Sequence, residues 1–339
     1  MDMITKNTKQ ISIDNINYKL YETSAKVIES KNATGNIIIP KSIEYGGEKY
    51  PIYKIGKRGF YNSSITSITF PEDSEIEAFG DQAFAICKSI KTITFPPKLL
   101  KLGRGWCVET PSLQKVEILE GSQNFITENG AIYSSDKSTL VFCQRNIESF
   151  EVPLPVSTIG IFAFRVHALK KVTFSENSNL RQINCSAFRE SSIESINLPP
   201  SLQIIKDYAF YGCHNLKTVS FQEGSQLREI LHHAFDSTAL TEITFSGPIS
   251  KIGMGCFKGA KNLKKLILAN EISVTILKDA FLNVSPDFNM YIRKNSFVKG
   301  EGKTEKILFL QEPNDEILLQ IQNLQNVLDW MIKQPQYNE

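Results

Sequence analysis

The chain of 339 residues has no surplus of charge of either sign. Lys and Arg number 38 and Asp and Glu number 36, which leaves a formal net charge of +2. Nucleic acids and anionic membranes attract clustered basic residues, so the charge balance argues against both. No apolar run approaches the roughly 18 residues that a transmembrane helix needs, and residues 1–6 lack the apolar centre of a signal peptide. We therefore expect no nucleic-acid partner and no membrane span.

Groups that carry out chemistry are also scarce. The four histidines include the adjacent pair His232 and His233, which has no Cys or acidic residue at metal-ligand spacing. The chain contains neither Cys-x-x-Cys nor Gly-x-Ser-x-Gly. Gly103-x-Gly105 and Gly253-x-Gly255 resemble phosphate loops, but they recur in phase with a repeat. The sequence thus predicts no catalytic residues, no metal ligands and no cofactor, and hence a protein that is not an enzyme.

What the sequence does contain is a repeat. In residues 198–216, Ile205 is followed five positions later by Phe210, and Leu216 then begins the pattern Leu-x-x-Val-x-Phe. The aromatic slot recurs every 22 to 25 residues, apart from one interval of 57 residues between Cys107 and Phe164. Such a period with this aliphatic skeleton is typical of leucine-rich repeats. The equivalent pairs are Ile55/Phe60, Phe79/Phe84, Leu102/Cys107, Ile159/Phe164, Ile183/Phe188, Ile205/Phe210, Ile230/Phe235, Ile252/Phe257 and Ile276/Phe281.

A single unit of this kind cannot bury its own apolar residues, so the units must stack into a solenoid. Each unit is predicted to contribute one short strand and one turn-like arm, giving a mainly-β or α/β repeat fold with a ribbon of parallel strands. The residue before the aromatic slot is usually Ala, because the arm packs closely on the next unit. At Trp106-Cys107 the two slots are exchanged. Either the indole fills the volume of the missing Phe or the local register is looser.

The repeat also organises the rest of the chain. We expect an N-terminal β cap over residues 11–54, the solenoid over 55–292, a linker over 293–313 and a C-terminal helix over 314–334. The long interval predicts a β-hairpin insertion at about 122–150 that extends from one side of the solenoid. The helix carries an apolar stripe that can fold back as a cap, bind a partner or support self-association. The stripe consists of Ile317, Ile321, Leu324, Leu328 and Met331.

Five of the six cysteines follow the phase of the repeat rather than a disulfide framework, and only Cys143 lies outside it. Cys87 and Cys213 stand three residues after the aromatic slot, while Cys107 and Cys256 occupy the arm itself. Small thiols at repeated core positions are usually buried and unpaired. The sequence therefore predicts free cysteines.

The pattern Ile-x-x-x-Ala-Phe-x-x-Cys-x-x-Leu-x-x-Val at residues 205–219 resembles the BspA-like leucine-rich repeat family. The segment 129–140 and Gly46-Gly47-Glu48-Lys49-Tyr50 are similar to further features of that family, and the resemblance covers about residues 15–290. The family is known from surface proteins of bacteria and protozoan parasites. The resemblance implies binding in cell adhesion or host interaction as a surface antigen, without catalysis, and it transfers no ligand residues.

The outward residues of the predicted strands form the candidate binding face. Side chains alternate along a strand, so the residues on either side of each central aliphatic point to solvent. With strands about 4.8 Å apart, they would form a ribbon about 40 Å long. Ser and Thr also simply suit an exposed strand, so a purely structural role remains an alternative. The candidates are Ser67, Thr69, Thr92, Thr94, Lys115, Glu117, Lys171, Thr173, Ser195, Asn197, Thr218, Ser220, Glu242, Thr244 and Lys265.

Two functions fit these observations. The first is a non-catalytic recognition solenoid that binds a host or matrix protein at the cell surface or after secretion, as the resemblance implies. The second is a cytoplasmic scaffold that binds a cytosolic protein through the strand face or the C-terminal helix. Free thiols and the absence of a signal sequence favour the second.

Overall fold

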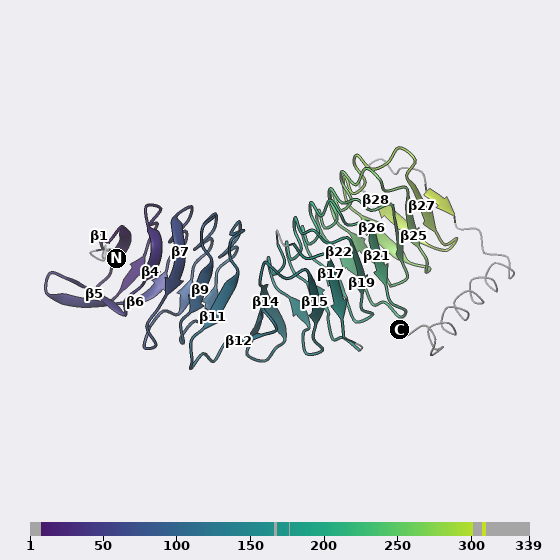
Figure 1. The fold of residues 1–339 in the computed structure, drawn as a ribbon. Helices are drawn as coiled ribbons and strands as arrows, with labels where there is room; N and C mark the ends of the chain where they lie inside the picture. The colour runs from purple at the N-terminus through teal and green to yellow at the C-terminus, as the bar shows by residue number, and fades with distance from the viewer. Residues whose placement is uncertain (1–7, 166–167, 176, 301–306, 310–339) are drawn as a thin grey trace, which may run out of the picture.

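The computed structural model describes residues 8–165, 168–175, 177–300 and 307–309. These residues form an elongated solenoid built from strands and turns, and they include no helix (Figure 1). The strands run along the chain from β1 at the purple end to β29 at the yellow end. This arrangement agrees with the predicted repeat fold.

The longer strands stack in parallel, one per repeat, into a first ladder. In the register Ser195 lies beside Thr218 and Leu198 beside Phe221. The strands of this ladder are β4 (Thr34–Ile38), β7 (Ser64–Thr69), β9 (Thr92–Phe95), β11 (Lys115–Ile118), β15 (Ser149–Val152), β17 (Lys171–Phe174), β19 (Ser195–Leu198), β21 (Thr218–Phe221), β23 (Glu242–Phe245), β25 (Lys265–Leu268), β27 (Asn289–Ile292) and β29 (Ile307–Phe309).

Each repeat also contributes a second, very short strand that the sequence analysis missed. The aliphatic residue that precedes the arm, such as Ile205, lies in it and is fully buried. In most repeats this strand has only two residues, as in β20, which is too few to show the alternation that marks a strand in sequence. This second ladder consists of β3 (Ala25–Val27), β6 (Glu48–Ile55), β8 (Ala78–Phe79), β10 (Lys101–Leu102), β14 (Thr139–Cys143), β16 (Thr158–Ile159), β18 (Gln182–Ile183), β20 (Ile204–Ile205), β22 (Glu229–Ile230), β24 (Lys251–Ile252), β26 (Ser273–Ile276) and β28 (Phe297–Gly300).

The arms join neighbouring repeats through both backbone and rings. The amide of Phe188 donates to the carbonyl of Ala209 at 2.8 Å, and the amide of Phe210 donates to that of Ala234 at 2.7 Å. The rings of Phe188 and Phe210 stack with centroids 4.9 Å apart and planes 3° from parallel. The Ala side chains are fully buried between the arms. A larger side chain would push these close-packed arms apart, which explains the preference for Ala.

A β-hairpin, β12 (Phe125–Glu128) with β13 (Ala131–Ser134), interrupts the solenoid. Strand β13 also pairs with β14, and neither ladder pairs directly across this region. Ile132 and Phe142 pack into the core on the N-terminal side, whereas Tyr133 and Leu140 pack into the core on the C-terminal side. The prediction that the insertion extends from one side is therefore wrong. Strands β13 and β14 lie between two cores because both of their faces carry apolar residues.

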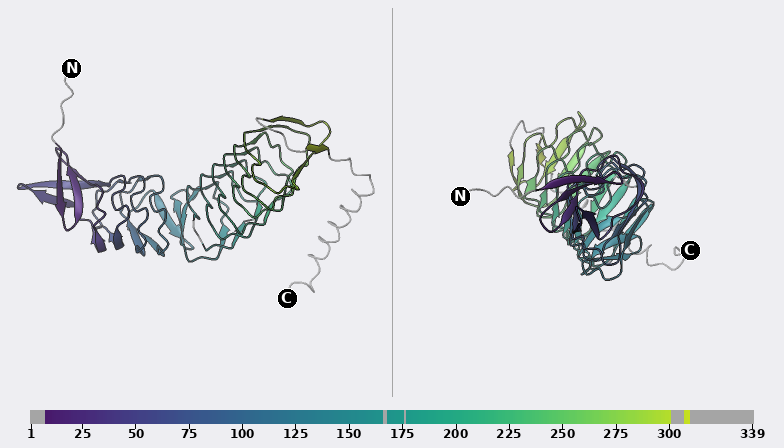
Figure 2. Two further views of the ribbon diagram at one scale, coloured as in Figure 1. Left: turned by 90° about the horizontal axis from the view of Figure 1, so that it is seen from above. Right: turned by 90° about the vertical axis from the view of Figure 1, so that its left-hand side faces the viewer.

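We call β3 to β11 the N-terminal half, β14 to β28 the C-terminal half, and the hairpin between them the joint. In Figure 2 the two halves run in different directions, and the change falls at the joint. Each half has its own hydrophobic core.

The 57-residue interval between Cys107 and Phe164 contains one shortened repeat unit. The amide of Cys143 donates to the carbonyl of Ala163 at 3.2 Å, as the arm Phe residues do elsewhere. Ile147, Phe150 and Val152 then supply the strand pattern, with Phe150 and Val152 buried. The arm was missed because only three positions, instead of five, separate Leu140 from Cys143.

At the exchanged slots the register is kept. The carbonyl of Trp106 accepts from the amide of Phe84 at 2.7 Å, as the carbonyl of Ala83 does from that of Phe60. The indole is buried, with its ring centroid 5.8 Å from that of Phe142 on β14. The alternative of a looser register is therefore wrong. A large residue fits here because the joint, rather than another Ala-Phe arm, follows.

The two ends differ from the predicted boundaries. Within residues 11–54, β3 and β4 already pair in parallel with β6 and β7, so the ladders begin inside the segment predicted as a cap. Before and beside them lie antiparallel pairings of β1 (Lys9–Ile13) with β2 (Ile16–Leu20) and of β5 (Ser42–Tyr45) with β6. That these strands cap the core stays a prediction.

At the other end, β28 and β29 fall in the segment 293–313, for which we predicted a linker. They pair in parallel with β26 and β27, so the linker prediction is wrong for these strands and the repeat continues past Ile292. The predicted helix over residues 314–334, with its apolar stripe, lies outside the described residues.

Candidate protein-interaction face

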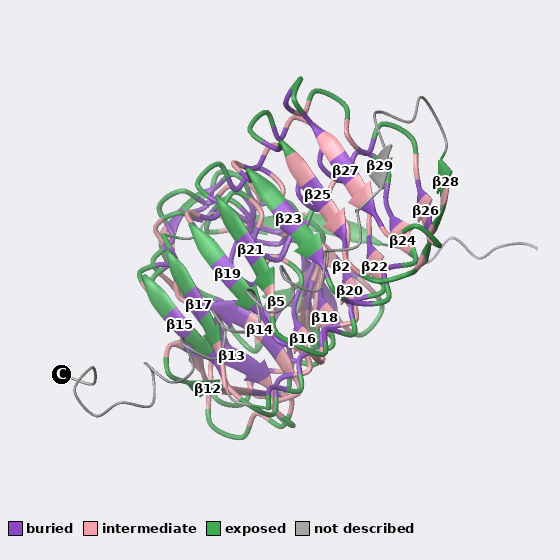
Figure 3. Ribbon diagram, turned by 90° about the vertical axis from the view of Figure 1, so that its right-hand side faces the viewer, coloured by how far each residue is buried: buried purple, intermediate pink, exposed green. Residues whose placement is uncertain are grey.

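The outward residues of the C-terminal half form an exposed polar surface. On β17 to β23 the residues that flank each central aliphatic are all exposed, while the aliphatic itself is buried. Figure 3 shows these strands side by side, coloured largely green for exposed residues. The predicted positions on this surface are Lys171, Thr173, Ser195, Asn197, Thr218, Ser220, Glu242 and Thr244, with Lys265 half-buried on β25.

The equivalent residues of the N-terminal half are less accessible. Ser67, Thr69, Thr92 and Glu117 are half-buried, and only Lys115 is exposed. Thr94 is 2% exposed, so the prediction that it faces solvent is wrong.

Polar contacts within this sheet account for part of the difference. The hydroxyl of Ser67 donates to the Asn36 amide oxygen at 2.9 Å, and Lys115 forms an ion pair with Glu117. Glu117 also lies directly beside Thr94 in the strand register and covers one side of it. These side chains hydrogen-bond or form ion pairs with one another, which leaves them less available to a ligand.

The predicted columns do not form one continuous ribbon. Strand β11 ends the N-terminal sheet and β15 begins the next, with no pairing between them. Six of the candidate residues therefore lie on one sheet and nine on the sheets beyond the joint. The single ribbon that we expected is wrong, because the joint separates the two sets.

Sequence reasoning missed four outward positions on strands that it had not placed or had assigned only loosely. Ser149 and Glu151 on β15 are exposed, and Asn289 and Tyr291 on β27 are half-buried. The Ile147-x-x-Phe150-x-Val152 pattern could have revealed β15. Lys265 lies with its ammonium 5.5 Å from the ring centroid of Tyr291, which extends the surface to β27.

The chemistry of this face is that of hydrogen bonding. Ser220 donates to the amide oxygen of Asn197 at 3.0 Å, and Ser175 donates to Glu151 at 3.2 Å. Within the described residues, no group of three or more His, Cys, Asp and Glu side chains is arranged to hold a metal ion. The surface offers hydroxyls, amides and a few charges in a regular array, which suits recognition of another polar surface.

The cysteines contribute no reactive group to this face. All six are free, five are buried and Cys185 is half-buried. Burial raises the pKa of the Cys107 and Cys143 thiols to about 12 and that of Cys213 to about 11. A thiol with so high a pKa is a poor nucleophile at neutral pH.

A parallel-strand solenoid with an aliphatic and Phe core at this period defines the class of leucine-rich repeat proteins. The chain belongs to the family described as BspA type leucine rich repeat region, which matches in six copies across residues 5–139, 137–264 and 181–298. A comparison with curated proteins returns no match.

Three solved structures are similar to this chain. The pneumococcal vaccine antigen PcpA is 19% identical over 88% of this chain and 100% of its own, with a TM-score of 0.46. A leucine rich cell surface protein from Faecalibacterium prausnitzii is 19% identical over 87% of this chain and 95% of its own, with a TM-score of 0.42. A leucine-rich repeat protein from Eubacterium ventriosum is 15% identical over 88% of this chain and 94% of its own, with a TM-score of 0.50. The last likeness supports the fold alone.

In the described part of the chain, no helix has the length and apolarity needed to span a membrane.

Proposed function

We propose that this protein is a non-catalytic recognition solenoid that binds a protein partner through the exposed strand face of β15 to β25. The observation that carries the proposal is that buried core residues and exposed polar residues alternate along each strand. In β19, Ile196 and Leu198 are buried whereas Ser195 and Asn197 are exposed. The core therefore leaves the outward residues free to vary with a partner.

The composition of the face favours a weak or repeated contact. Interface hot spots are enriched in Trp, Tyr and Arg, and none of these occurs among the outward residues of β15 to β23. Neighbouring strands repeat similar polar groups about 4.8 Å apart. An extended partner that touches several strands would add many small contributions, and Lys171, Glu242 and Lys265 would supply its charge specificity.

For the setting of this binding, we propose adhesion or host contact at the cell surface. Membership of the BspA type repeat family supports this setting, and two of the similar solved structures are those of a vaccine antigen and a cell surface protein. The proposal has a competitor in a cytoplasmic scaffold, which the six free cysteines favour, because disulfides are common in exported proteins.

The test is to coat beads with the purified protein and measure their adhesion to epithelial monolayers, with albumin-coated beads as control. In parallel, antibody is applied to intact and permeabilised source cells. We expect adhesion above the albumin control and labelling of intact cells. Labelling only after permeabilisation, together with no adhesion, would overturn the surface proposal in favour of the scaffold.

A further inference from the structure

A second surface lies on the turns rather than the strands of the C-terminal half. We call it the turn ridge and define it by Arg189, Tyr208, Tyr211 and His233, which come from three consecutive arms. The rings of Tyr208 and His233 stack with centroids 5.1 Å apart and planes 4° from parallel. Tyr211 meets Tyr208 edge-on at 5.7 Å. The guanidinium carbon of Arg189 lies 4.7 Å from the ring centroid of Tyr211.

The ridge is built on fixed supports. Nδ1 of His233 is 2.8 Å from a carboxylate oxygen of Asp236, which is itself buried. The His233 ring also lies against Gly255, where an added Cβ would come as close as 2.5 Å to it. Tyr208 therefore stacks on a ring that is held by a hydrogen bond and by close packing, and it remains 38% exposed. Aromatic anchors held in this way lose little conformational entropy on binding.

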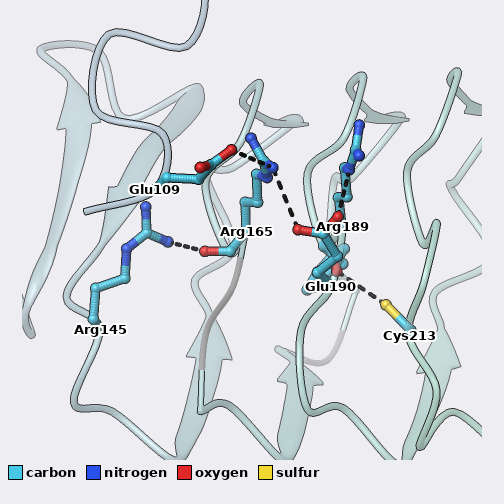
Figure 4. Close-up of polar contacts among 7 residues, drawn as sticks. Glu109, Arg145, Arg165, Arg189, Glu190 and Cys213 are labelled. Carbon is cyan, nitrogen blue, oxygen red and sulfur yellow. Dashed lines mark hydrogen bonds and ion pairs between the residues drawn. The ribbon is translucent and has the colours of Figure 1, made fainter. Parts of the chain in front are cut away.

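The charges on the ridge leave the terminal nitrogens of one arginine without a protein partner among the described residues. Glu190 accepts from Nε of Arg189 at 3.1 Å and from Arg165 at 3.3 Å, so one carboxylate serves two guanidinium groups. Figure 4 shows the terminal nitrogens of Arg189 directed away from Glu190. No ion pair or hydrogen bond between described residues uses these two nitrogens. A paired set of donors of this kind matches a carboxylate in a bidentate arrangement.

We propose that the turn ridge binds a protein segment that carries a carboxylate next to a ring, either that of an aromatic side chain or that of a proline. The carboxylate would pair with the terminal nitrogens of Arg189, and the ring would pack on Tyr208 and Tyr211. Tyr and Arg are the residues that dominate interface energetics, and the strand face lacks them on β15 to β23. The inference goes beyond the proposed function because it assigns a different surface with a different chemistry.

The corresponding turns of the N-terminal half do not provide such a site. Arg58 lies 4.6 Å from the ring centroid of Tyr61, and its Nε donates to Gln82 at 2.9 Å, much as Arg189 donates to Glu190, but the rings that would continue the array are missing. The positions equivalent to Tyr61 in the next two arms are Ala85 and Val108. The aromatic array is therefore confined to the C-terminal half.

The experiment uses a displayed library of random peptides of about 12 residues, a length that spans the ridge in extended form. The full chain is the bait, and counter-selection uses the Arg189→Gln, Tyr208→Asn double variant. Asn is chosen because Tyr208 has a φ of 58°, which Asn tolerates better than most residues. We expect enriched peptides to contain Asp or Glu next to Trp, Tyr, Phe or Pro.

A synthetic copy of an enriched peptide is then titrated against single variants. Arg189→Lys, which keeps the charge but not the paired donors, and Tyr208→Asn should each weaken binding by about tenfold. Asn197→Arg on the strand face should leave peptide binding unchanged, so the ridge and the proposed function can fail separately. Thermal unfolding of each variant checks that the fold is kept.

Three results would overturn the inference. The first is enrichment of peptides without a carboxylate. The second is enrichment of peptides that bind both single variants as tightly as they bind the parent protein. The third is a failure to enrich any peptide while a glycan array shows binding that Tyr208→Asn abolishes. That result would assign the ridge to a carbohydrate instead of a protein segment.

Discussion

The two halves of the solenoid share one interior pattern but present different surfaces. In the C-terminal half, rings stack from Phe164 through Phe281 at centroid distances between 4.8 and 5.6 Å. In the N-terminal half, the stack of arm rings consists of Phe60 and Phe84, after which Trp106 joins an aromatic cluster with other geometries. The outward strand residues on β15 to β23 are exposed, whereas those on β25 and β27 and most of those in the N-terminal half are half-buried.

The comparison shows which parts of the repeat are constrained. Buried Ile, Ala and Phe positions must match between neighbours, because each unit is stabilised by the units on either side. Outward positions on the strands and turns do not have to match those of the neighbouring units, so they can differ between halves. We infer that recognition belongs to the C-terminal half, where both the strand face and the turn ridge are accessible.

The joint allows the halves to differ without separating them. Glu109, in the last arm of the N-terminal half, forms an ion pair with Arg165 at 3.5 Å. Arg165 forms a second ion pair with Glu190 at 3.3 Å. Arg145 is buried beneath them and donates to the carbonyl of Arg165 (Figure 4). This chain of charges links arms on both sides of the hairpin.

The largest effect is expected from breaking the stacked rings. Phe210→Ala removes a ring that lies between Phe188 and Phe235, and it should lower the free energy of unfolding by about 3–5 kcal/mol. Because the halves have separate cores, amide hydrogen exchange should accelerate in β17 to β23 far more than in β7 and β9. The exposed substitution Thr218→Ala is the control, with an expected change within about 0.5 kcal/mol. Equal acceleration in both halves would contradict the division into two cores.

A smaller effect is expected from the ion-pair chain across the joint. Arg165→Met should lower the free energy of unfolding by about 1.5–3 kcal/mol, the range for hydrogen bonds to charged groups. Urea denaturation measures this change. Lys170→Met is the matched control, since its pair with Glu148 is exposed and worth at most about 1 kcal/mol. Similar losses in the two variants would mean that Arg165 does not link the halves.

The same chain predicts a response to acid. Burial alone would raise the pKa of Glu190, but the charges of Arg165 and Arg189 outweigh it and hold the pKa below its ordinary value. A lowered folded-state pKa stabilises the protein above the unfolded pKa of about 4.3, and this contribution is lost as the pH falls through the folded value. We therefore measure the free energy of unfolding by denaturation at neutral pH and below pH 4. It should fall less on acidification for Glu190→Gln than for the parent protein. An unchanged acid slope would exclude Glu190 as a contributor.

The smallest effect concerns reactivity without any change in stability. Cys185 is the one half-buried thiol of the six, all of which are described, and it should react first with a thiol reagent in the native protein. Burial raises the pKa of Cys107, Cys143 and Cys213, so these thiols should react only after unfolding. Mass spectrometry of the labelled peptides gives the order, and early labelling at Cys143 would indicate that the joint opens.

The sequence predicted the interior of this fold better than its surface. Residues such as Ile205 and Phe210 recur with a period that only stacking can satisfy, so their burial could be foreseen. The shortened unit at Cys143 could not be found by the same spacing, and two-residue strands leave no periodic signal. Thr94 is covered through the register with Glu117, which depends on tertiary packing. Tyr208 and Arg189 lie on turns, where the repeat pattern gives no indication of which side chains meet.

The most direct test compares the two strand faces in the same adhesion assay. Beads coated with Ser195→Arg, Thr218→Arg protein are compared with beads coated with Ser67→Arg, Thr92→Arg protein, after both variants are shown to unfold at the temperature of the parent. We predict that the C-terminal pair lowers adhesion about tenfold or more, as clashes at an interface centre do, while the N-terminal pair leaves it within about twofold. Loss of adhesion with the N-terminal pair alone, or with neither pair, would contradict recognition by the C-terminal half.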